Sequence, residues 1–247
     1  GLVRGKLYGP PNDFIDYDLT FLKPWKSSSK VRFELEPQKG STKVTWLMDS
    51  SLPFFLFWMK KSMTAYIGMD YERGLAMLKD YAEDGEVHSK LDFKGVSEYP
   101  GCTYIGIQTD CAMDQVGPRM EEDLTKLGTF LSDREDLVAA PPFSMYHKWD
   151  AVRRQIAYTS AFPVNSIPGD LPAGFITGEI PATKVYTLVH TGPYDHLGNA
   201  WSTLYNMQRN KVFKLNKKIN PFEVYISDPG EVPGEKLVTE VHFPVRG

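Results

Sequence analysis

The sequence predicts an α+β protein in which one strand–helix–strand–strand unit occurs twice, behind a smaller antiparallel region. The duplication is visible in short matching segments: PFSMY at 142–146 recurs as PFEVY at 221–225, and AFPV at 161–164 recurs as HFPV at 242–245. The two offsets are 79 and 81 residues. A near-constant offset across several segments indicates a duplicated unit rather than chance similarity.

The N-terminal region is predicted to be an antiparallel meander followed by a long helix. Apolar and polar residues alternate at 15–21, 31–37 and 42–48, and QKGS at 38–41 marks a turn between the last two strands. From 59 to 83 the apolar residues recur every three or four positions, which is typical of one helix face. Three strands and one helix make a thin domain, which we interpret as incomplete.

Each repeat of the C-terminal region has the same predicted elements. Strands are expected at 103–107 and 185–189, and each is followed by a helix with an apolar stripe. The stripes contain Met120, Leu124 and Leu127 in the first repeat and Leu197, Trp201 and Leu204 in the second. We therefore expect a domain at 1–85, a polar, glycine-punctuated linker at 86–98, and a duplicated domain at 99–247 with pseudo-twofold symmetry.

Composition argues against several functions. The net charge of −3 shows no basic excess of the kind that nucleic-acid binding requires. The densest apolar stretch, 52–59, is too short to cross a bilayer. No histidine or cysteine pattern has metal-site spacing, and no nucleophile elbow or phosphate loop is present. We expect no metal, no cofactor, no nucleic-acid partner and no direct membrane contact.

The comparison of the two repeats singles out Glu223. In the strand at 221–226, Phe222, Val224 and Ile226 face one side, whereas Glu223 and Tyr225 face the other. The aligned strand of the first repeat has Ser144 and Tyr146 at the matching places, so the phenol occurs twice and the carboxylate once. Glu223 is then either a solvated strand residue or the floor of a pocket between the repeats, where ligands tend to bind.

Three further aromatic residues are candidates for that pocket. Tyr194 follows a Gly-Pro turn, and it either lines the groove or fills a loop against the core. Trp201 belongs to the apolar face of its helix, which favours core packing but allows it to form a back wall. Trp149 lies at a strand end, where it is either half exposed or stacked on a flat ligand.

The region from about 98 to 245 resembles the GyrI-like family, the bacterial effector-binding domain of multidrug-responsive transcription activators. The residues that carry the likeness are IPATKVYTLVHTGPYDHLGNAWSTL at 180–204, FEVYISDP at 222–229 and LVTEVHFPV at 237–245. The resemblance implies that Glu223 is the acidic residue at the base of an aromatic small-molecule pocket. Tyr225 and Tyr146, on the matching strands, either form walls of this pocket or lie on the surface of the sheet. Many relatives attach this domain to a helix-turn-helix, which the present sequence does not show.

Residues 12–84 resemble the C-terminal half of a START-like, or polyketide cyclase-like (SRPBCC), helix-grip domain. The likeness rests on GSTKVTWLMDSSLPFF at 40–55 and IGMDYERGLAMLKDYAE at 67–83. Such domains normally begin with a further strand and two helices, and some fusions carry a membrane anchor. We expect that this partial domain lost its start or is completed by a partner.

Three functions follow from these expectations. The first is a binding module for bulky aromatic or cationic small molecules, which acts as a sensor or sequestering protein without its own DNA-binding domain. The alternative is a hydrolase that opens cyclopropane rings of DNA-alkylating natural products, in which Glu223 activates water and Tyr225 holds the leaving oxygen. The third is a structural role, in which the N-terminal region forms a homodimer through unpaired strand edges. The expected location is the cytoplasm, or the membrane surface if an anchor precedes residue 1.

Overall fold

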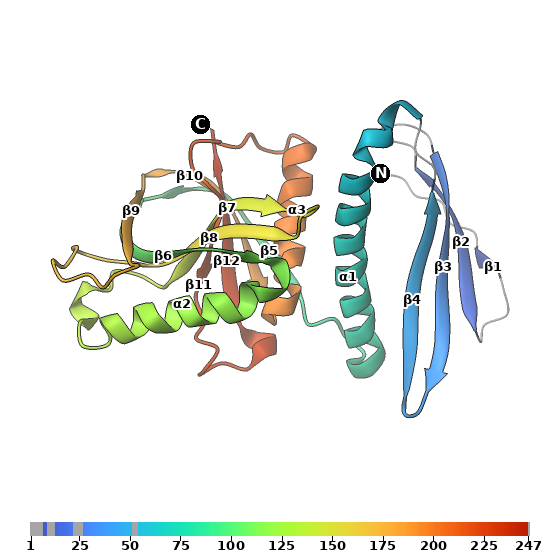
Figure 1. Ribbon diagram of the computed structural model, residues 1–247, viewed down its shortest axis with the longest axis horizontal. Helices are drawn as coiled ribbons and strands as arrows, with labels where there is room; N and C mark the ends of the chain where they lie inside the picture. The colour runs from blue at the N-terminus through green and yellow to red at the C-terminus, as the bar shows by residue number, and fades with distance from the viewer. Residues whose placement is uncertain (1–6, 9–12, 22–26, 51–53, 247) are drawn as a thin grey trace. The chain divides into compact units, whose positions relative to one another are not determined.

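The computed structural model describes residues 7–8, 13–21, 27–50 and 54–246 of the chain (Figure 1). It is a mixed α+β protein with two antiparallel sheets, as the sequence predicts. The chain divides into two compact units, 1–79 and 80–247, and the boundary falls within a long helix. Each unit is described separately.

The N-terminal unit is one four-stranded antiparallel sheet with a helix. Its strands β1 (Leu7–Tyr8), β2 (Phe14–Phe21), β3 (Ser27–Gln38) and β4 (Ser41–Ser50) lie side by side in chain order. A 3₁₀ turn, η1 (Phe54–Met59), leads into α1 (Lys60–Asp84), close to the predicted helix at 59–83. The predicted strands and turn of this region are confirmed.

An aromatic stack joins the helix to the sheet within the N-terminal unit. Trp46 of β4 lies between Phe33 and Tyr71, with ring centroids 4.7 and 4.0 Å away. Gly74 of α1 permits this approach, because a Cβ atom there would lie 2.6 Å from the Trp46 ring. Among the described residues of this unit, Val31 is the one hydrophobic side chain that is fully buried. The unit is therefore as thin as the sequence suggests.

The C-terminal unit is built on an eight-stranded antiparallel sheet. The first repeat supplies β6 (Cys102–Ala112), α2 (Val116–Leu131), β7 (Phe143–Asp150) and β8 (Gln155–Pro163). The second repeat supplies β10 (Thr183–Thr191), α3 (Gly198–Arg209), β11 (Phe222–Tyr225) and β12 (Val238–Val245). Strand, helix, strand, strand is the predicted order for both repeats, and it is confirmed.

Two strands outside the repeats complete the sheet, whose order is β5-β10-β12-β11-β7-β8-β6-β9. The strand β5 (Lys90–Tyr99) precedes the first repeat but pairs with β10 of the second. Conversely, β9 (Ile176–Ile180) precedes the second repeat but pairs with β6 of the first. The order is thus symmetric about the junction of β11 and β7, and each repeat receives an edge strand from the segment before the other.

The predicted linker at 86–98 is wrong, because most of it forms β5. This edge strand is exposed along most of its length. Leu91 and Phe93 alternate with polar residues, but this alternation is too short to predict a strand by itself. A bulge at Gly95, where φ is +80°, also interrupts the period of two. The predicted domain boundary after residue 85 falls instead at Lys79, inside α1.

Both helices of the C-terminal unit cover the same face of the sheet (Figure 1). Leu127 and Leu131 of α2 pack with Ile105 of β6, and Leu204 of α3 packs with Leu188 of β10. The central strands β11 and β7 lie between the two helix-covered regions. Side chains that point from these central strands toward the helices therefore lie on the pseudo-twofold axis.

Candidate functional site

The candidate site lies where β11 and β7 pair at the centre of the eight-stranded sheet. In this pair, Glu223 lies directly opposite Ser144, and Phe222 lies opposite Met145. Because side chains alternate across a strand, Glu223 and Ser144 share the face on which α2 and α3 pack. The matched positions that the repeats predict are thus direct neighbours in the fold.

Three aromatic donors surround the Glu223 carboxylate. Tyr225 and Tyr146 donate hydroxyl hydrogen bonds to Oε1, at 2.7 and 2.9 Å. Trp201, from α3, donates from Nε1 to Oε2 at 2.5 Å. The three side chains come from β11, β7 and α3, so both repeats contribute. We call Glu223 and these three donors the aromatic cage.

Glu223 is 2% exposed, and its burial has a clear electrostatic consequence. Burial raises the pKa of its carboxyl group, because an apolar surrounding disfavours the ionised form, while the three hydrogen bonds favour that form and oppose the shift. Burial and the nearby carboxylate also hold the pKa values of Tyr146 and Tyr225 well above the usual value for a phenol. Both phenols therefore stay protonated and act as donors.

The two repeats differ at the cage for a physical reason. Ser144 occupies the place that corresponds to Glu223, and its Oγ lies 3.3 Å from Oγ of Ser160 on β8. Facing side chains in an antiparallel pair are about 5 Å apart, and like charges directly opposite each other are destabilising. A second carboxylate at position 144 would face Glu223 at this distance, so one repeat carries a small neutral residue.

Two further rings extend from the cage toward the surface. Tyr194, in the short helix η4 (Tyr194–His196), contacts Tyr225 edge to face at 5.7 Å and is 39% exposed. Trp149, on β7, lies 5.9 Å from Tyr146 and is 45% exposed. Each is one ring away from the carboxylate. The structure therefore brings Glu223 and the five predicted aromatic site residues into one continuous group.

Trp201 combines the two roles that its sequence position left open. Its ring packs 5.4 Å from Phe243 in the core and 4.9 Å from Tyr146 in an edge-to-face contact. Its Nε1 also points at Glu223. It is therefore a packing residue and a wall of the cage together.

Sequence reasoning missed Met120 as a cage neighbour. The Tyr225 hydroxyl lies 2.8 Å from Sδ of Met120, on the first turns of α2. Met120 was visible in the sequence only as the start of an apolar helix stripe. Its contact with Tyr225 brings α2 to one side of the cage, whereas Trp201 brings α3 to the other.

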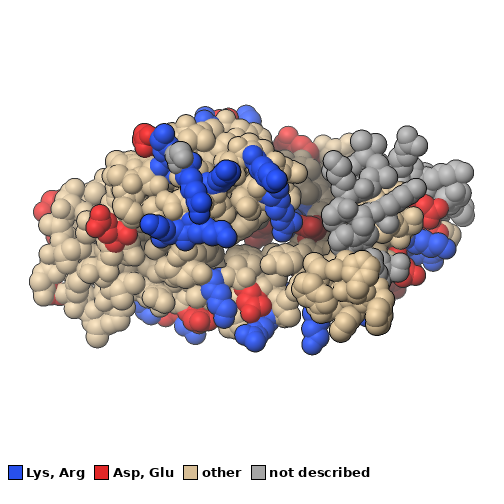
Figure 2. Space-filling model, turned by 90° about the horizontal axis from the view of Figure 1, so that it is seen from above, with Lys and Arg blue, Asp and Glu red and all other residues tan. Residues whose placement is uncertain are grey.

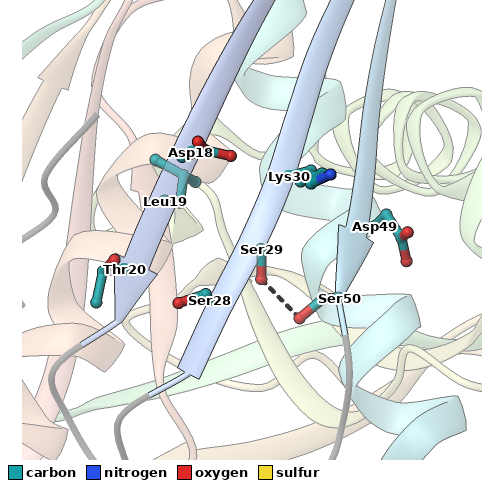
Figure 3. Close-up of a pocket in the computed structure, with 8 residues that line it drawn as sticks. All are labelled: Asp18, Leu19, Thr20, Ser28, Ser29, Lys30, Asp49 and Ser50. Carbon is teal, nitrogen blue, oxygen red and sulfur yellow. Dashed lines mark hydrogen bonds between the residues drawn. The ribbon is translucent and has the colours of Figure 1, made fainter. Parts of the chain in front are cut away.

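Two hollows on the surface of the described residues lie away from Glu223, which lines neither. One is a shallow polar hollow at the ends of β2, β3 and β4 (Figure 3), where Oγ of Ser29 donates to Oγ of Ser50 at 2.7 Å. Successive residues of β3 line it although they point to opposite faces, so it is a sheet end rather than an enclosed site. The other pocket lies on the sheet face away from the helices.

Among the described residues, no group of three histidine, cysteine, aspartate or glutamate side chains is arranged to hold a metal ion. Within the same residues, no helix is both long and apolar enough to cross a membrane. Figure 2 shows one face of the molecule, on which basic side chains occur together with acidic ones and with a larger area of other residues.

Comparison with protein families gives a match over the region that contains the cage. Residues 131–246 match the GyrI-like small molecule binding domain. The C-terminal unit is therefore similar to this family over 116 of the 247 residues of the chain. The match begins at the end of α2, so the compact unit extends further toward the N-terminus than the matched residues. A comparison with curated proteins gave no match.

Two solved structures support the fold of the C-terminal unit. EcmrR, in a cryo-EM structure of its complex with DNA, is 18% identical, with a TM-score of 0.53 over 78% of this chain and 72% of that chain. SAV2435, in a structure with bound tetraphenylphosphonium, is 14% identical, with a TM-score of 0.50 over 63% of this chain and 94% of that chain. At these identities the similarity shows the fold alone.

Proposed function

We propose that the C-terminal unit is a GyrI-like domain that binds bulky aromatic cations at Glu223, and that the protein acts as a sensor or sequestering module for them. The observation that carries this proposal is a buried carboxylate whose hydrogen-bond partners are three neutral rings. Within the described residues, no lysine or arginine forms an ion pair with Glu223. Buried carboxylates are normally paired with a cation, so a cationic ligand supplies what the site lacks.

The expected energies are large enough for specific binding. A unit positive charge about 4 Å from the carboxylate gains roughly 4 kcal/mol at an effective dielectric constant of 20. Each tyrosine or tryptophan ring that faces the cation adds about 0.5 to 2 kcal/mol. The tyrosine and tryptophan rings also bury the apolar surface of an aromatic ligand. This combination favours cations with delocalised or shielded charge over strongly hydrated ones.

Ligand entry requires the cage to open. In the structure, Tyr146, Tyr225 and Trp201 occupy the space against the carboxylate and satisfy both of its oxygens. A cation that replaces these donors must displace one or more rings. Tyr194 and Trp149 are the exposed rings next to the cage, and we place the entrance between them and the carboxylate.

Tetraphenylphosphonium is a suitable probe, because its charge is enclosed by four rings and it was found bound to the structurally similar SAV2435. Titration into the wild type should quench or shift tryptophan fluorescence, because Trp201 is part of the cage. Glu223→Gln keeps the size of the side chain and removes the charge, and we expect at least tenfold weaker binding.

The matched control is Glu235→Gln, which removes an exposed glutamate from the same domain. It should bind the probe as the wild type does. Equal affinity of Glu223→Gln and the wild type, measured by calorimetry with both variants folded, would refute the role of the carboxylate. A soluble neutral analogue with the shape of tetraphenylmethane should bind the wild type and Glu223→Gln equally, because it carries no charge that Glu223 could attract.

A second candidate function is hydrolysis that opens a strained ring. It is favoured by the contact of Tyr225 with Glu223 and by the raised pKa of Glu223, because a general base works best with a pKa near the working pH. Water attack would need the same opening of the cage. A turnover assay on a cyclopropane-containing alkylating compound separates the functions, since product formation that persists in Glu223→Ala excludes the proposed base.

For the N-terminal unit we propose a relationship to START-like domains and a role in dimer formation. Its four strands and long helix agree with the order expected for a partial helix-grip domain of the START-like type. We propose that this unit forms a homodimer through the edge strands of its sheet, which sedimentation analysis at several concentrations would test. We also propose that the protein acts in the cytoplasm, which cell fractionation would test.

A further inference from the structure

The second pocket lies on the opposite side of the sheet from the aromatic cage. Val224 and Ile226 line it, and these residues alternate along the chain with Glu223 and Tyr225 of the cage. Its volume is about 530 Å³, which lies within the range of small-molecule sites. The pocket is therefore large enough for a ligand and is separated from Glu223 by the thickness of β11.

The sheet curls around this pocket. Gly101, in the turn between β5 and β6, packs against the turn that follows β9, because a Cβ atom there would lie 2.6 Å from the carbonyl oxygen of Ile180. The two edges of the sheet thus approach each other at one end. The interior is filled by an apolar cluster that includes Phe143, Val185 and Phe222. The pocket is the open mouth of this interior, and mouths of rolled sheets are frequent ligand sites.

Polar groups are built into one wall of the pocket. His242 of β12 is 6% exposed, and its two ring nitrogens contact Oγ1 of Thr187 at 2.9 Å and Oε2 of Glu240 at 3.2 Å. An ionised carboxylate only accepts hydrogen bonds, so Nε2 of His242 carries a proton and donates to Glu240. The ring of His242 also stacks on Phe222 at 4.9 Å. The imidazole is therefore fixed in place.

Glu240 is the group at the rim that can meet a ligand. The hydrogen bond from His242 lowers the pKa of Glu240 and keeps its carboxylate ionised. In the part of the chain that the structure describes, its Oε1 has no hydrogen-bond partner. Among the other charged residues of the rim, Lys94 contacts Asp92 and its positive charge also helps to lower the pKa of Glu240, and Glu98 lies 3.8 Å from Lys184.

We propose that this pocket is a second small-molecule site, which binds a compact aromatic amine with the amine at Glu240 and the rings over Phe143, Val185 and Val224. The apolar floor accounts for the rings, and the half-exposed carboxylate accounts for the positively charged donor. The volume limits the body to about two or three fused rings. The site goes beyond the proposed function, because Glu223 takes no part in it.

The experiment uses the full chain in the Glu223→Gln background, which removes the cage carboxylate. The probe is 2-naphthylmethylamine, and its anionic counterpart 2-naphthoate tests the charge. Isothermal calorimetry should show one saturable amine site per chain and at least tenfold weaker binding of the naphthoate. Absence of saturable amine binding, or equal binding of the two probes, overturns the proposal.

Two variants of β5 locate the site. Ser97 lines the pocket, whereas its neighbour Val96 points to the other face, where it is exposed. Ser97→Phe should fill the mouth and weaken amine binding at least tenfold, and the matched Val96→Phe should leave it unchanged. Unchanged binding in Ser97→Phe, or an equal loss in both variants, contradicts the assignment.

The controls separate this proposal from others. Ser97→Phe in a background with Glu223 intact should still bind tetraphenylphosphonium, which shows that the domain is folded and that the cage is independent. Glu240→Gln should weaken binding of the amine but not of 2-naphthalenemethanol. If sedimentation shows that the wild type dimerises and that Ser97→Phe abolishes the dimer, the pocket is a contact between protein copies and the small-molecule assignment is wrong.

Discussion

Trp201→Phe tests the cage by removing one hydrogen bond to Glu223 together with part of the packing surface of the indole, and only the first of these losses should depend on pH. Phenylalanine retains an aromatic ring that can pack on Phe243 and Tyr146, but it lacks the Nε1 donor that lies 2.5 Å from Oε2 of Glu223. The substitution therefore leaves Oε2 of a buried carboxylate without its partner. Its effect should depend on whether that carboxylate is ionised.

The expected magnitude follows from the charge on the acceptor. A hydrogen bond to a charged group contributes about 1.5 to 3 kcal/mol, roughly twice the value for a neutral pair. We expect Trp201→Phe to lower the free energy of unfolding by about this amount when Glu223 is ionised. Because the hydrogen bond from Trp201 favours the ionised carboxylate, its loss should raise the pKa of Glu223 further.

The sign of the pH dependence is fixed by the direction of this shift. The pKa of Glu223 is already raised in the folded protein, so the folded state holds a proton that the unfolded state has released, and stability falls as pH rises through that window. Trp201→Phe raises the pKa of Glu223 in the folded protein further, and it widens the pH range over which the folded state binds a proton that the unfolded state has released. The variant should therefore lose the most stability above the folded pKa and much less at low pH, where Glu223 is protonated in both proteins.

Urea unfolding followed by circular dichroism from pH 4 to 9 measures this difference. Trp149→Phe is the matched control, because Trp149 is 45% exposed and has no contact with the carboxylate among the interactions described. Its effect should be small and independent of pH. A destabilisation by Trp201→Phe that is the same at every pH would show that the indole does not stabilise an ionised Glu223, and the reasoning for the cage would fail.

Three further results are expected. Binding of tetraphenylphosphonium should weaken as pH falls through the raised pKa of Glu223, because the neutral acid attracts a cation less, and calorimetry across pH should show no such change in Glu223→Gln. Leu204→Ala, at a fully buried position of α3, should lower the free energy of unfolding by about 2 to 5 kcal/mol in urea titrations, and a loss below 1 kcal/mol would contradict the core assignment. Gly101→Ala should destabilise the C-terminal unit and lower its thermal midpoint, because φ is +83° and a Cβ atom would lie 2.6 Å from the Ile180 carbonyl, whereas Gly117→Ala, with open space around it, should not.

Much of the C-terminal fold could be predicted from the sequence because duplication repeats the signal. The matching segments at 142–146 and 221–225 predict β7 and β11, and their alignment matches Glu223 with Ser144, the residue that it faces in the sheet. The edge strands β5 and β9 could not be predicted in this way. They lie outside the repeats, so repetition did not mark them, and the apolar alternation within each strand is short.

The sequence predicted which residues form the candidate site but not how they contact each other. The sequence indicated Glu223 and the tyrosines, because an acidic residue occurs on one of two matched strands. The donor role of Trp201 depends on how α3 crosses the sheet, and the contact of Met120 depends on α2, so neither follows from local spacing. In the sequence, His242 and Glu240 are two polar residues at alternating positions of a strand, and only the pairing of β12 with β10 and the curl of the sheet bring them to a pocket with Thr187.

The exchange of edge strands between the repeats limits where the C-terminal unit can be truncated and which part of it can be transferred to another protein. The strand β5 precedes the first repeat in the chain but pairs with β10 of the second. A fragment that starts after Tyr99 would therefore leave the backbone groups on one edge of β10 unpaired along its whole length. Unpaired strand edges promote aggregation, so the truncated fragment should aggregate under conditions in which the longer protein remains in solution. Excision of either repeat for use as a minimal receptor should fail for the same reason, whereas transplanting both repeats with the strand before each should succeed.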